Sequence, residues 1–357
     1  MDIPPVDGCD LLSTIDVGMQ DICEKALTDK LKELNASVGV AVLMEVATGE
    51  VKAIVNMTKA GDGNYYEMRN NAISDMLEPG STFKIITSTA ALEAGAVSLN
   101  DTFYCPGFKI VEDRRIRCHK AGGHGSETFV QGVQNSCNPV FMEVGARLGV
   151  GGMFRGMRQL GILSKTNIDV PGEASTIMHQ QKNVGAVELA TMSFGQSFQL
   201  SPIRLLTSVS AVINGGHSIV PHFGVSIENT SNGSVRKLSY PQKKKIVSKE
   251  TSENMKMILE SVVTEGSGSK ASVEGYQVGA KTGTSEKLPR RSGKYIASCI
   301  GFAPADDPKV LTVVLIDEPE GIYYGGTIAA PVVSELLDNA LPYFCLLYTS
   351  PSPRDRG

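Results

Sequence analysis

The stretch EPGSTFKIIT, residues 78–87, places a serine, Ser81, three positions before a lysine, Lys84, directly after a Pro-Gly pair. The Pro-Gly pair indicates a turn, and the residues after it, 81–96, are predicted to form a helix. Side chains three apart on a helix face the same side, so the hydroxyl and the amine would lie within reach of each other. The pair alone is weak evidence for catalysis, because an N-capping serine and a surface lysine explain it as well, and the same spacing recurs elsewhere in the chain.

Two more short motifs follow the first along the chain. SCN, residues 136–138, lies in the loop-like stretch QNSCNP, and KTGT, residues 281–284, lies on a predicted strand. Each motif is weak by itself, but the three in this order form the set that activates a serine nucleophile with a lysine base. A Ser/His/Asp hydrolase is not favoured, because there is no G-x-S-x-G and the five histidines form no diagnostic pattern.

Strand-like runs occur near both ends of the chain, with helical stretches between them. Residues 38–57 form two such runs around the turn ATGE, and residues 275–286 and 295–319 supply three more. Residues 248–263 predict an amphipathic helix whose apolar face carries Met255, Ile258, Leu259 and Val262. We therefore predict an α/β (α+β) fold, with one sheet built from distant parts of the chain and a largely helical insertion at about 100–240.

Composition excludes several classes of protein. Of the 357 residues, 41% are hydrophobic and 20% are charged, as in a globular protein with a sizeable core. A net charge of −4 and a single lysine cluster, residues 243–245, argue against nucleic-acid binding. No stretch has the length and apolarity of a transmembrane helix, and the first residues, MDIPPVDGCD, lack the pattern of a signal peptide.

The two ends of the chain differ in character from its middle. Residues 327–344 predict a closing helix. Residues 345–357, CLLYTSPSPRDRG, resemble the translation of a sequencing adapter and are excluded from the fold. The alternative is that they form a genuine Pro/Ser-rich tail. The start predicts a strand followed by a helix, in the style of a protein interior, so Met1 is interpreted as an internal methionine of a longer parent. We expect one domain, residues 1–344.

Five segments carry a resemblance to a known family: EPGSTFK, SCNPVF, SFGQSFQLSP, INGGHSIVPH and GAKTGTSE. They resemble the transpeptidase domain of class B penicillin-binding proteins, most of all the septal, cell-division type, from about Asp7 to Phe344. The resemblance implies the fold shared with serine β-lactamases, an antiparallel sheet flanked by helices with a mostly helical subdomain. It also implies a D,D-transpeptidase that cross-links peptidoglycan stem peptides ending in D-Ala-D-Ala, binds β-lactams covalently and uses no catalytic cofactor.

The resemblance assigns the catalytic roles. Ser81 would be the nucleophile and Lys84 the base, while Ser136 would relay a proton to the leaving amine and Asn138 would hold the substrate amide and orient the lysine. A lysine acts as a base near pH 7 only if its pKa falls from about 10.4 by roughly three units, or about 4 kcal/mol. Burial and the positive charge of Lys281 are expected to lower the pKa in this way.

The third motif is expected to bind the substrate. Lys281, Thr282 and Thr284 would hold the terminal carboxylate of the peptide or of a β-lactam. The backbone N–H groups of Ser81 and Thr284 would form the oxyanion hole. Gly283 has no side chain and would leave room for the acyl group along the strand.

Two other functions remain open from the sequence. A serine β-lactamase shares the three motifs, but a class A enzyme also needs a glutamate that activates water, and the surroundings of Glu173 in VPGEAS do not resemble that loop. A catalytically inactive scaffold that binds wall peptide is the other alternative, although all three motifs are intact. A stable penicilloyl adduct on Ser81 is therefore expected rather than rapid turnover.

Four soft ligands fall in one region: Cys105, Cys118, His124 and Cys137. Three thiolates and an imidazole can hold a structural Zn²⁺ tetrahedrally, and His119 could replace His124. A Cys105–Cys118 disulfide around a predicted hairpin, or buried free thiols, are the alternatives. The resemblance adds that some elongation-type relatives carry a metal at the matching place, with carboxylates in place of cysteines.

The resemblance also implies a cellular setting. The parent would carry a membrane helix and a pedestal domain, and would work on the periplasmic side of the inner membrane with a membrane glycan polymerase and division proteins as partners. The stretch YYGGTIAAP, which contains Tyr323 and Tyr324, resembles a loop that borders the pocket in this family, although ordinary hairpin packing explains it equally well.

Overall fold

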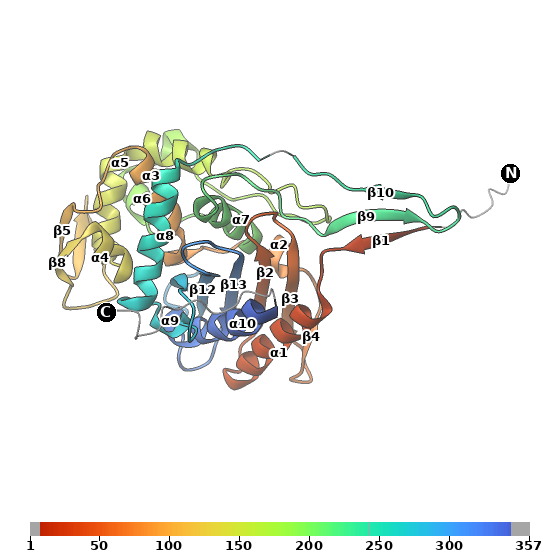
Figure 1. Ribbon diagram of the computed structural model, residues 1–357. Coiled ribbons are helices and arrows are strands. Elements are labelled where there is room, and N and C mark those ends of the chain that lie inside the picture. Colours follow the sequence, from red (N-terminus) through yellow and green to blue (C-terminus); the bar gives the residue numbers. More distant parts are fainter. Residues whose placement is uncertain (1–7, 242, 344–357) are drawn as a thin grey trace, which may run out of the picture.

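The computed structural model describes residues 8–241 and 243–343. Its centre is a six-stranded antiparallel sheet in the order β11-β12-β13-β2-β3-β4 (Figure 1). The first strand of this sheet along the chain, β2, pairs directly with the last, β13, in a register that sets Val313 opposite Val42. The prediction of one sheet built from distant segments is thus confirmed. The strands are β2 (Val38–Glu45), β3 (Val51–Lys59), β4 (Tyr65–Glu67), β11 (Gly279–Glu286), β12 (Tyr295–Ala303) and β13 (Val310–Asp317).

Both faces of the sheet are covered by apolar layers. Along β2, Val40 and Val42 belong to one hydrophobic core, whereas Ala41 and Leu43 belong to the other, as the two-residue period of a strand requires. Helices α1 (Val17–Glu33) and α10 (Ala330–Tyr343) pack together on the second of these faces (Figure 1). The other face carries α7 (Pro202–Ile213) and α8 (Lys249–Thr264), and the predicted apolar face of α8 is fully buried.

The helical subdomain follows the strand β4. Its elements are α2 (Asn71–Ser74), the 3₁₀ turn η1 (Gly80–Phe83), α3 (Lys84–Glu93), α4 (Phe129–Gln134), α5 (Asn138–Gln159), η2 (Gln181–Asn183) and α6 (Ala186–Met192). The helix predicted at 81–96 therefore begins as a tighter 3₁₀ turn and ends at Glu93. The helix predicted at 327–344 is divided into α9 (Gly325–Ile328) and α10, while Phe344 and the proposed adapter segment 345–357 lie outside the described residues.

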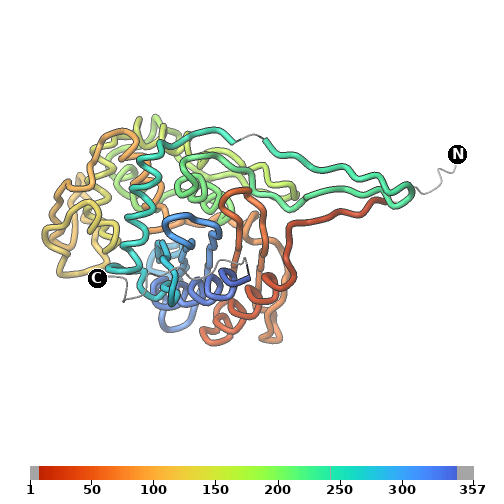
Figure 2. Tube along the Cα trace, in the orientation of Figure 1, coloured from red at the N-terminus to blue at the C-terminus, as the bar shows by residue number. Residues whose placement is uncertain are grey.

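Three small sheets complete the middle of the chain. β5 (Thr102–Cys105) pairs with β8 (Gly125–Thr128), and between them lies the hairpin of β6 (Phe108–Val111) and β7 (Arg114–Arg117), which confirms the hairpin predicted between the two cysteines. The third sheet is an arm that projects from the body (Figures 1 and 2), in which β1 (Cys9–Ser13) pairs with β9 (Gly224–Asn229) and β9 with β10 (Val235–Lys237). The remaining element is the short 3₁₀ turn η3 (Ser269–Ala271).

None of the helices in the described ranges, 8–241 and 243–343, combines the length and the apolarity needed to cross a membrane.

Candidate active site

The turn that carries Ser81 is held between two other segments of the chain. Gly80 has a φ of +57°, and a Cβ there would lie 2.2 Å from Ser285 Oγ, so only glycine fits this position. The Gly80 N–H donates to the carbonyl of Gly195 at 2.9 Å. These contacts fix Ser81 on the 3₁₀ turn directly before α3, with Lys84 as the first residue of that helix.

Lys84 is completely buried, and its amine lies within hydrogen-bond distance of three acceptors in the second motif, which its charged form can satisfy together. Nζ donates to the Ser136 carbonyl at 2.6 Å, to Ser136 Oγ at 3.2 Å and to Asn138 Oδ1 at 2.8 Å. Burial lowers the pKa of Lys84 to about 7, the fall that a general base at neutral pH requires. Among the described residues no hydrogen bond joins Lys84 to Ser81, so the predicted nucleophile and its predicted base are neighbours in the chain but are not bonded to each other.

The second motif owes its shape to an unusual backbone. Ser136 has a φ of +53°, which few non-glycine residues adopt and which is common where function fixes the geometry. Cys137 then caps α5, whose first turn contains Asn138 and Pro139, a residue suited to that position. As a result the Ser136 hydroxyl points toward both lysines, and Asn138 Oδ1 toward Lys84.

The third motif lies on β11, at one edge of the sheet. Lys281 is completely buried and donates to Ser136 Oγ at 2.9 Å and to the Thr282 carbonyl at 3.0 Å. Its pKa is lowered by burial and then by the charge of Lys84. The sequence analysis predicted that the charge of Lys281 lowers the pKa of Lys84, but this effect is not seen. Burial alone lowers the pKa of Lys84, and Cys137, Cys118 and Glu127 act to raise it.

The two threonines of the third motif face α9. The Gly325 N–H donates to Thr284 Oγ1 at 3.0 Å, and this leaves the threonine hydroxyl proton free to donate to a ligand. Thr282 is buried on the same side of the strand. Within the described part of the chain this strand pairs only with β12, so the backbone groups of its other edge remain available there for an added peptide strand.

Gly283 has a packing role that the sequence did not predict. A Cβ at this position would lie 2.6 Å from Ser298 Oγ, 3.1 Å from Thr82 Cγ2 and 3.2 Å from the Pro79 carbonyl. The missing side chain therefore lets β11 approach the turn that carries the nucleophile. Room for an acyl group along the strand stays a prediction.

Two carboxylates, those of Glu173 and Glu78, already accept hydrogen bonds from other parts of the chain. Glu173 accepts the backbone N–H groups of Thr166 at 2.5 Å and Asn167 at 3.2 Å, so it closes its own loop rather than facing Ser81. Glu78, buried just before the nucleophile, accepts the Ser197 N–H at 2.9 Å and an Arg290 guanidinium at 2.5 Å. This Glu78–Arg290 pair was not foreseen, since nothing local links the two positions.

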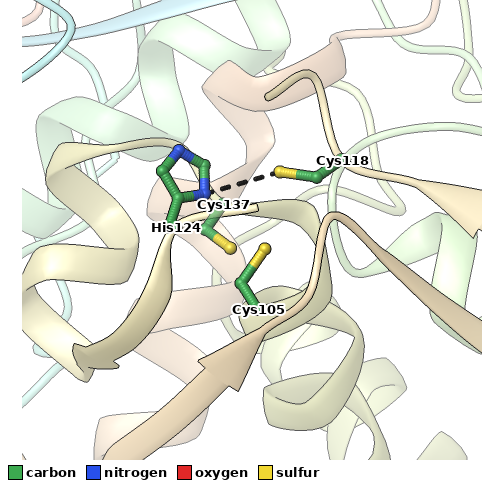
Figure 3. Close-up of side chains that lie close together, drawn as sticks. All are labelled: Cys105, Cys118, His124 and Cys137. Carbon is green, nitrogen blue, oxygen red and sulfur yellow. Dashed lines mark hydrogen bonds between the residues drawn. The ribbon is translucent and has the colours of Figure 1, made fainter. Parts of the chain in front are cut away.

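The four predicted metal ligands converge behind the second motif. Ligand atoms of Cys105, Cys118, His124 and Cys137 all lie within 4.8 Å of one another (Figure 3). Cys118 Sγ lies 3.6 Å from His124 Nδ1, and tetrahedral bonds of ~2.3 Å to sulfur and ~2.0 Å to nitrogen would place two such atoms about 3.6 Å apart. The geometry is compatible with a zinc site, in which His124 rather than His119 would be the nitrogen ligand.

The three cysteine thiols of the cluster are free to bind a metal ion. The three cysteines are free, so the alternative Cys105–Cys118 disulfide is not formed in this structure. A hydrogen bond from the Cys137 thiol lowers the pKa of Cys118, which favours its thiolate. Sequence analysis missed Glu127, which is buried beside the cluster with Oε2 lacking a hydrogen-bond partner and lying 3.8 Å from His124 Nδ1.

The two tyrosines of the late loop do lie beside the third motif. Tyr323 stacks on Tyr295 with ring centroids 3.8 Å apart, and Tyr324 is exposed. The next residue, Gly325, makes the hydrogen bond to Thr284. Both sequence interpretations therefore hold in part, because the loop packs on a strand and borders the site.

Comparison with known proteins agrees with this geometry. Residues 39–338 match the family described as the penicillin binding protein transpeptidase domain. The chain is 42% identical over 353 residues to stage V sporulation protein D of Bacillus subtilis and 31% identical over 362 residues to the probable peptidoglycan D,D-transpeptidase PenA of Neisseria meningitidis. These alignments cover 95% and 97% of this chain but 54% and 59% of the relatives, so the chain spans little more than half their length.

A solved structure gives the same result. The apo transpeptidase domain of penicillin-binding protein 3 from Burkholderia pseudomallei aligns with 96% of this chain and 98% of its own, at a TM-score of 0.83 and 28% identity. The predicted fold is thereby confirmed. On the family match, the relatives and the three converged motifs, the chain belongs to the transpeptidase domain family of class B penicillin-binding proteins.

Proposed function

We propose that this chain is a serine D,D-transpeptidase that cross-links peptidoglycan stem peptides ending in D-Ala-D-Ala and is acylated by β-lactams. The observation that carries the proposal is Lys84: it is buried, has a pKa of about 7, and donates only to neutral acceptors of the second motif. A lysine kept partly uncharged one helical turn from a serine is the arrangement that makes the hydroxyl nucleophilic.

In the proposed reaction each residue of the three motifs has a definite role. The Ser81 hydroxyl attacks the carbonyl of the penultimate D-Ala while neutral Lys84 accepts its proton, and the N–H groups of Ser81 and Thr284 stabilise the oxyanion. The proton then passes through Ser136, which bonds both lysines, to the amine of the departing D-Ala. A second stem peptide supplies an amine that attacks the ester, releases the Ser81 hydroxyl and completes the cross-link.

A labelling experiment tests the proposal. A fluorescent penicillin should add one mass increment per chain, and Ser81→Ala should abolish it. Ser234→Ala is the matched control, since that exposed serine has the same spacing to a lysine but lies on the arm. Absence of the adduct with rapid hydrolysis of the drug would indicate a β-lactamase instead, an outcome that the commitment of Glu173 to its own loop disfavours. A chain that neither labels nor hydrolyses would be the inactive scaffold.

The cluster of Cys105, Cys118, His124 and Cys137 would hold a structural Zn²⁺. The ion would tie the base of the β6–β7 hairpin to the start of α5 and so hold the second motif, with no part in the chemistry. Elemental analysis of chelator-free protein should give one zinc per chain, lost in Cys137→Ser but kept in Cys23→Ser, a buried cysteine outside the cluster. Metal-free protein with two thiols missing from titration would instead establish a disulfide.

The cellular role extends beyond what the chain itself contains. The intact parent would be anchored to the membrane and would act on the periplasmic side of the inner membrane with a glycan polymerase and division proteins. A septal duty follows from the sequence resemblance, whereas the name of the Bacillus relative refers to sporulation. Fluorescent fusions of the full-length parent would distinguish these duties by their position and timing in the cell.

A further inference from the structure

The β6–β7 hairpin carries a positive charge that the catalytic mechanism does not use. Residues 108–120 contain five lysines and arginines against two carboxylates, in a chain whose net charge is −4. The hairpin also touches the active site, because Asn138 Nδ2 donates to the Arg117 carbonyl at 3.3 Å while Oδ1 of the same side chain accepts from Lys84. A basic element thus forms one rim of the catalytic site.

Strand alternation sorts the hairpin side chains into two faces. Val111 and Ile116 pack on the core, and Lys109 on that face pairs with Glu143 of α5. The register sets Arg115 opposite Ile110 and Arg117 opposite Phe108, so these four residues share the other face. Ile110 is 63% exposed and both arginines are exposed, which leaves this outer face open to solvent.

The cations of the outer face lack carboxylate partners. The Arg115 guanidinium lies over the Phe108 ring, 3.7 Å from its centroid, a stack that orients its donors but leaves its charge unpaired. Neither Arg115 nor Arg117 makes an ion pair with any residue in the described ranges, 8–241 and 243–343. By contrast, Lys109 forms an ion pair with Glu143, and Arg114 forms one with Asp113.

We propose that the outer face of the hairpin, Arg115 and Arg117 with Phe108 and Ile110, binds the carboxylates of an acidic stem peptide whose reacting end lies in the catalytic site. This inference rests on the proposed function and names a part of the substrate that the three motifs do not contact. Arginine suits this role because its planar donors match a carboxylate, and the ring and isoleucine beside it contact the apolar parts of the peptide. An acidic peptide is favoured over an anionic membrane because the hairpin backbone is bonded to a residue of the second motif.

Peptide binding to the purified chain tests the inference. The probe is a stem pentapeptide ending in D-Ala-D-Ala with free side carboxylates, and the reference is the same peptide with those carboxylates amidated. Arg115→Ala and Arg117→Ala should each weaken binding of the acidic peptide about five-fold, the equivalent of about 1 kcal/mol for an exposed charge pair, and should leave the amidated peptide unaffected. Arg114→Ala is the matched control, since it removes the same charge from the opposite face and should change neither affinity.

The outcomes separate this inference from the proposed function. Labelling by fluorescent penicillin should be the same in all variants, because the drug lacks the distal carboxylates; failure of the wild-type chain to label would refute the proposed function itself. With labelling intact, equal effects of Arg114→Ala and Arg117→Ala, or equal affinity for the two peptides, would overturn the inference. If Arg115→Ala and Arg117→Ala weaken binding to phosphatidylglycerol vesicles but leave the peptide affinity unchanged, the inference is also overturned and the hairpin is assigned to the membrane.

Discussion

Acylation of Ser81 should depend on pH with a midpoint near 7, set by the ionisation of Lys84. The pKa of about 7 lies below the usual value of 10.5, a difference worth about 5 kcal/mol. The neutral amine would then rise from about one tenth of the molecules at pH 6 to about nine tenths at pH 8, whereas an unshifted lysine would be neutral in fewer than about one molecule in a thousand at pH 7. The rate constant for acylation should follow this fraction and increase about ten-fold between pH 6 and pH 8.

The sharpest perturbation is Asn138→Asp, which replaces the amide oxygen 2.8 Å from Nζ with a carboxylate. A negative charge at this distance favours the ammonium form, so the pKa of Lys84 should rise by about one to three units. The acylation midpoint should move upward by the same amount, and the rate at pH 7 should fall about 5-fold to 500-fold, with part of the loss recovered at high pH. Asn229→Asp, on the distant arm, makes the same charge change and should leave the midpoint in place.

The measurement is pseudo-first-order labelling by a fluorescent penicillin from pH 5.5 to pH 9. A flat profile in the wild-type chain, or a midpoint that does not move in Asn138→Asp, would refute the assignment of Lys84 as the base. A shift of equal size in Asn229→Asp would show that the drug or the overall charge, rather than the local contact, governs the profile.

Two further substitutions test the packing around the site. Gly80→Ala should abolish labelling and lower the melting temperature, because its Cβ would clash with Ser285. Gly95→Ala is the control, since Gly95 has a similar φ of +62° but open space around it. A comparable loss in Gly95→Ala would show that backbone strain alone accounts for the effect. Leu259→Ala in α8 should cost about 2–5 kcal/mol of unfolding free energy in denaturant titrations, since the side chain is fully buried. Met257→Ala, on the exposed side of the same helix, should cost under about 1 kcal/mol, and similar losses at both positions would contradict the packing of this helix.

The parts of the structure that the sequence predicted well are those fixed by local pattern or by chemistry. The apolar face of α8 and the strands of the main sheet could be predicted from local sequence, because each lies within one continuous run long enough to show its pattern. The three motifs could be grouped without coordinates because their order along the chain resembles that of a known family. The convergence of Cys105, Cys118, His124 and Cys137 was likewise predictable from residue type.

The parts that escaped prediction depend on contacts between segments far apart in the chain. The pairing of β1 with β9 joins residues more than two hundred positions apart, and every residue of β1 is exposed, so no buried apolar face marks this pairing in the sequence. Glu78 and Arg290 meet only because the β11–β12 loop returns to the nucleophile turn. The φ of Ser136 is set by the residues packed around it rather than by its own preference, which is why QNSCNP predicted a loop but not its shape.

The low pKa of Lys84 results from its burial, and the groups that accept hydrogen bonds from its amine are all neutral. Its acceptors are a carbonyl, a hydroxyl and an amide, each of which satisfies a donor without the charge that would hold the proton. The cysteines and Glu127 lie close enough to raise the pKa, yet burial outweighs them. We therefore expect an asparagine, rather than an aspartate, to be needed at position 138, since its neutral amide accepts a hydrogen bond from Lys84 without the charge that would stabilise the ammonium form.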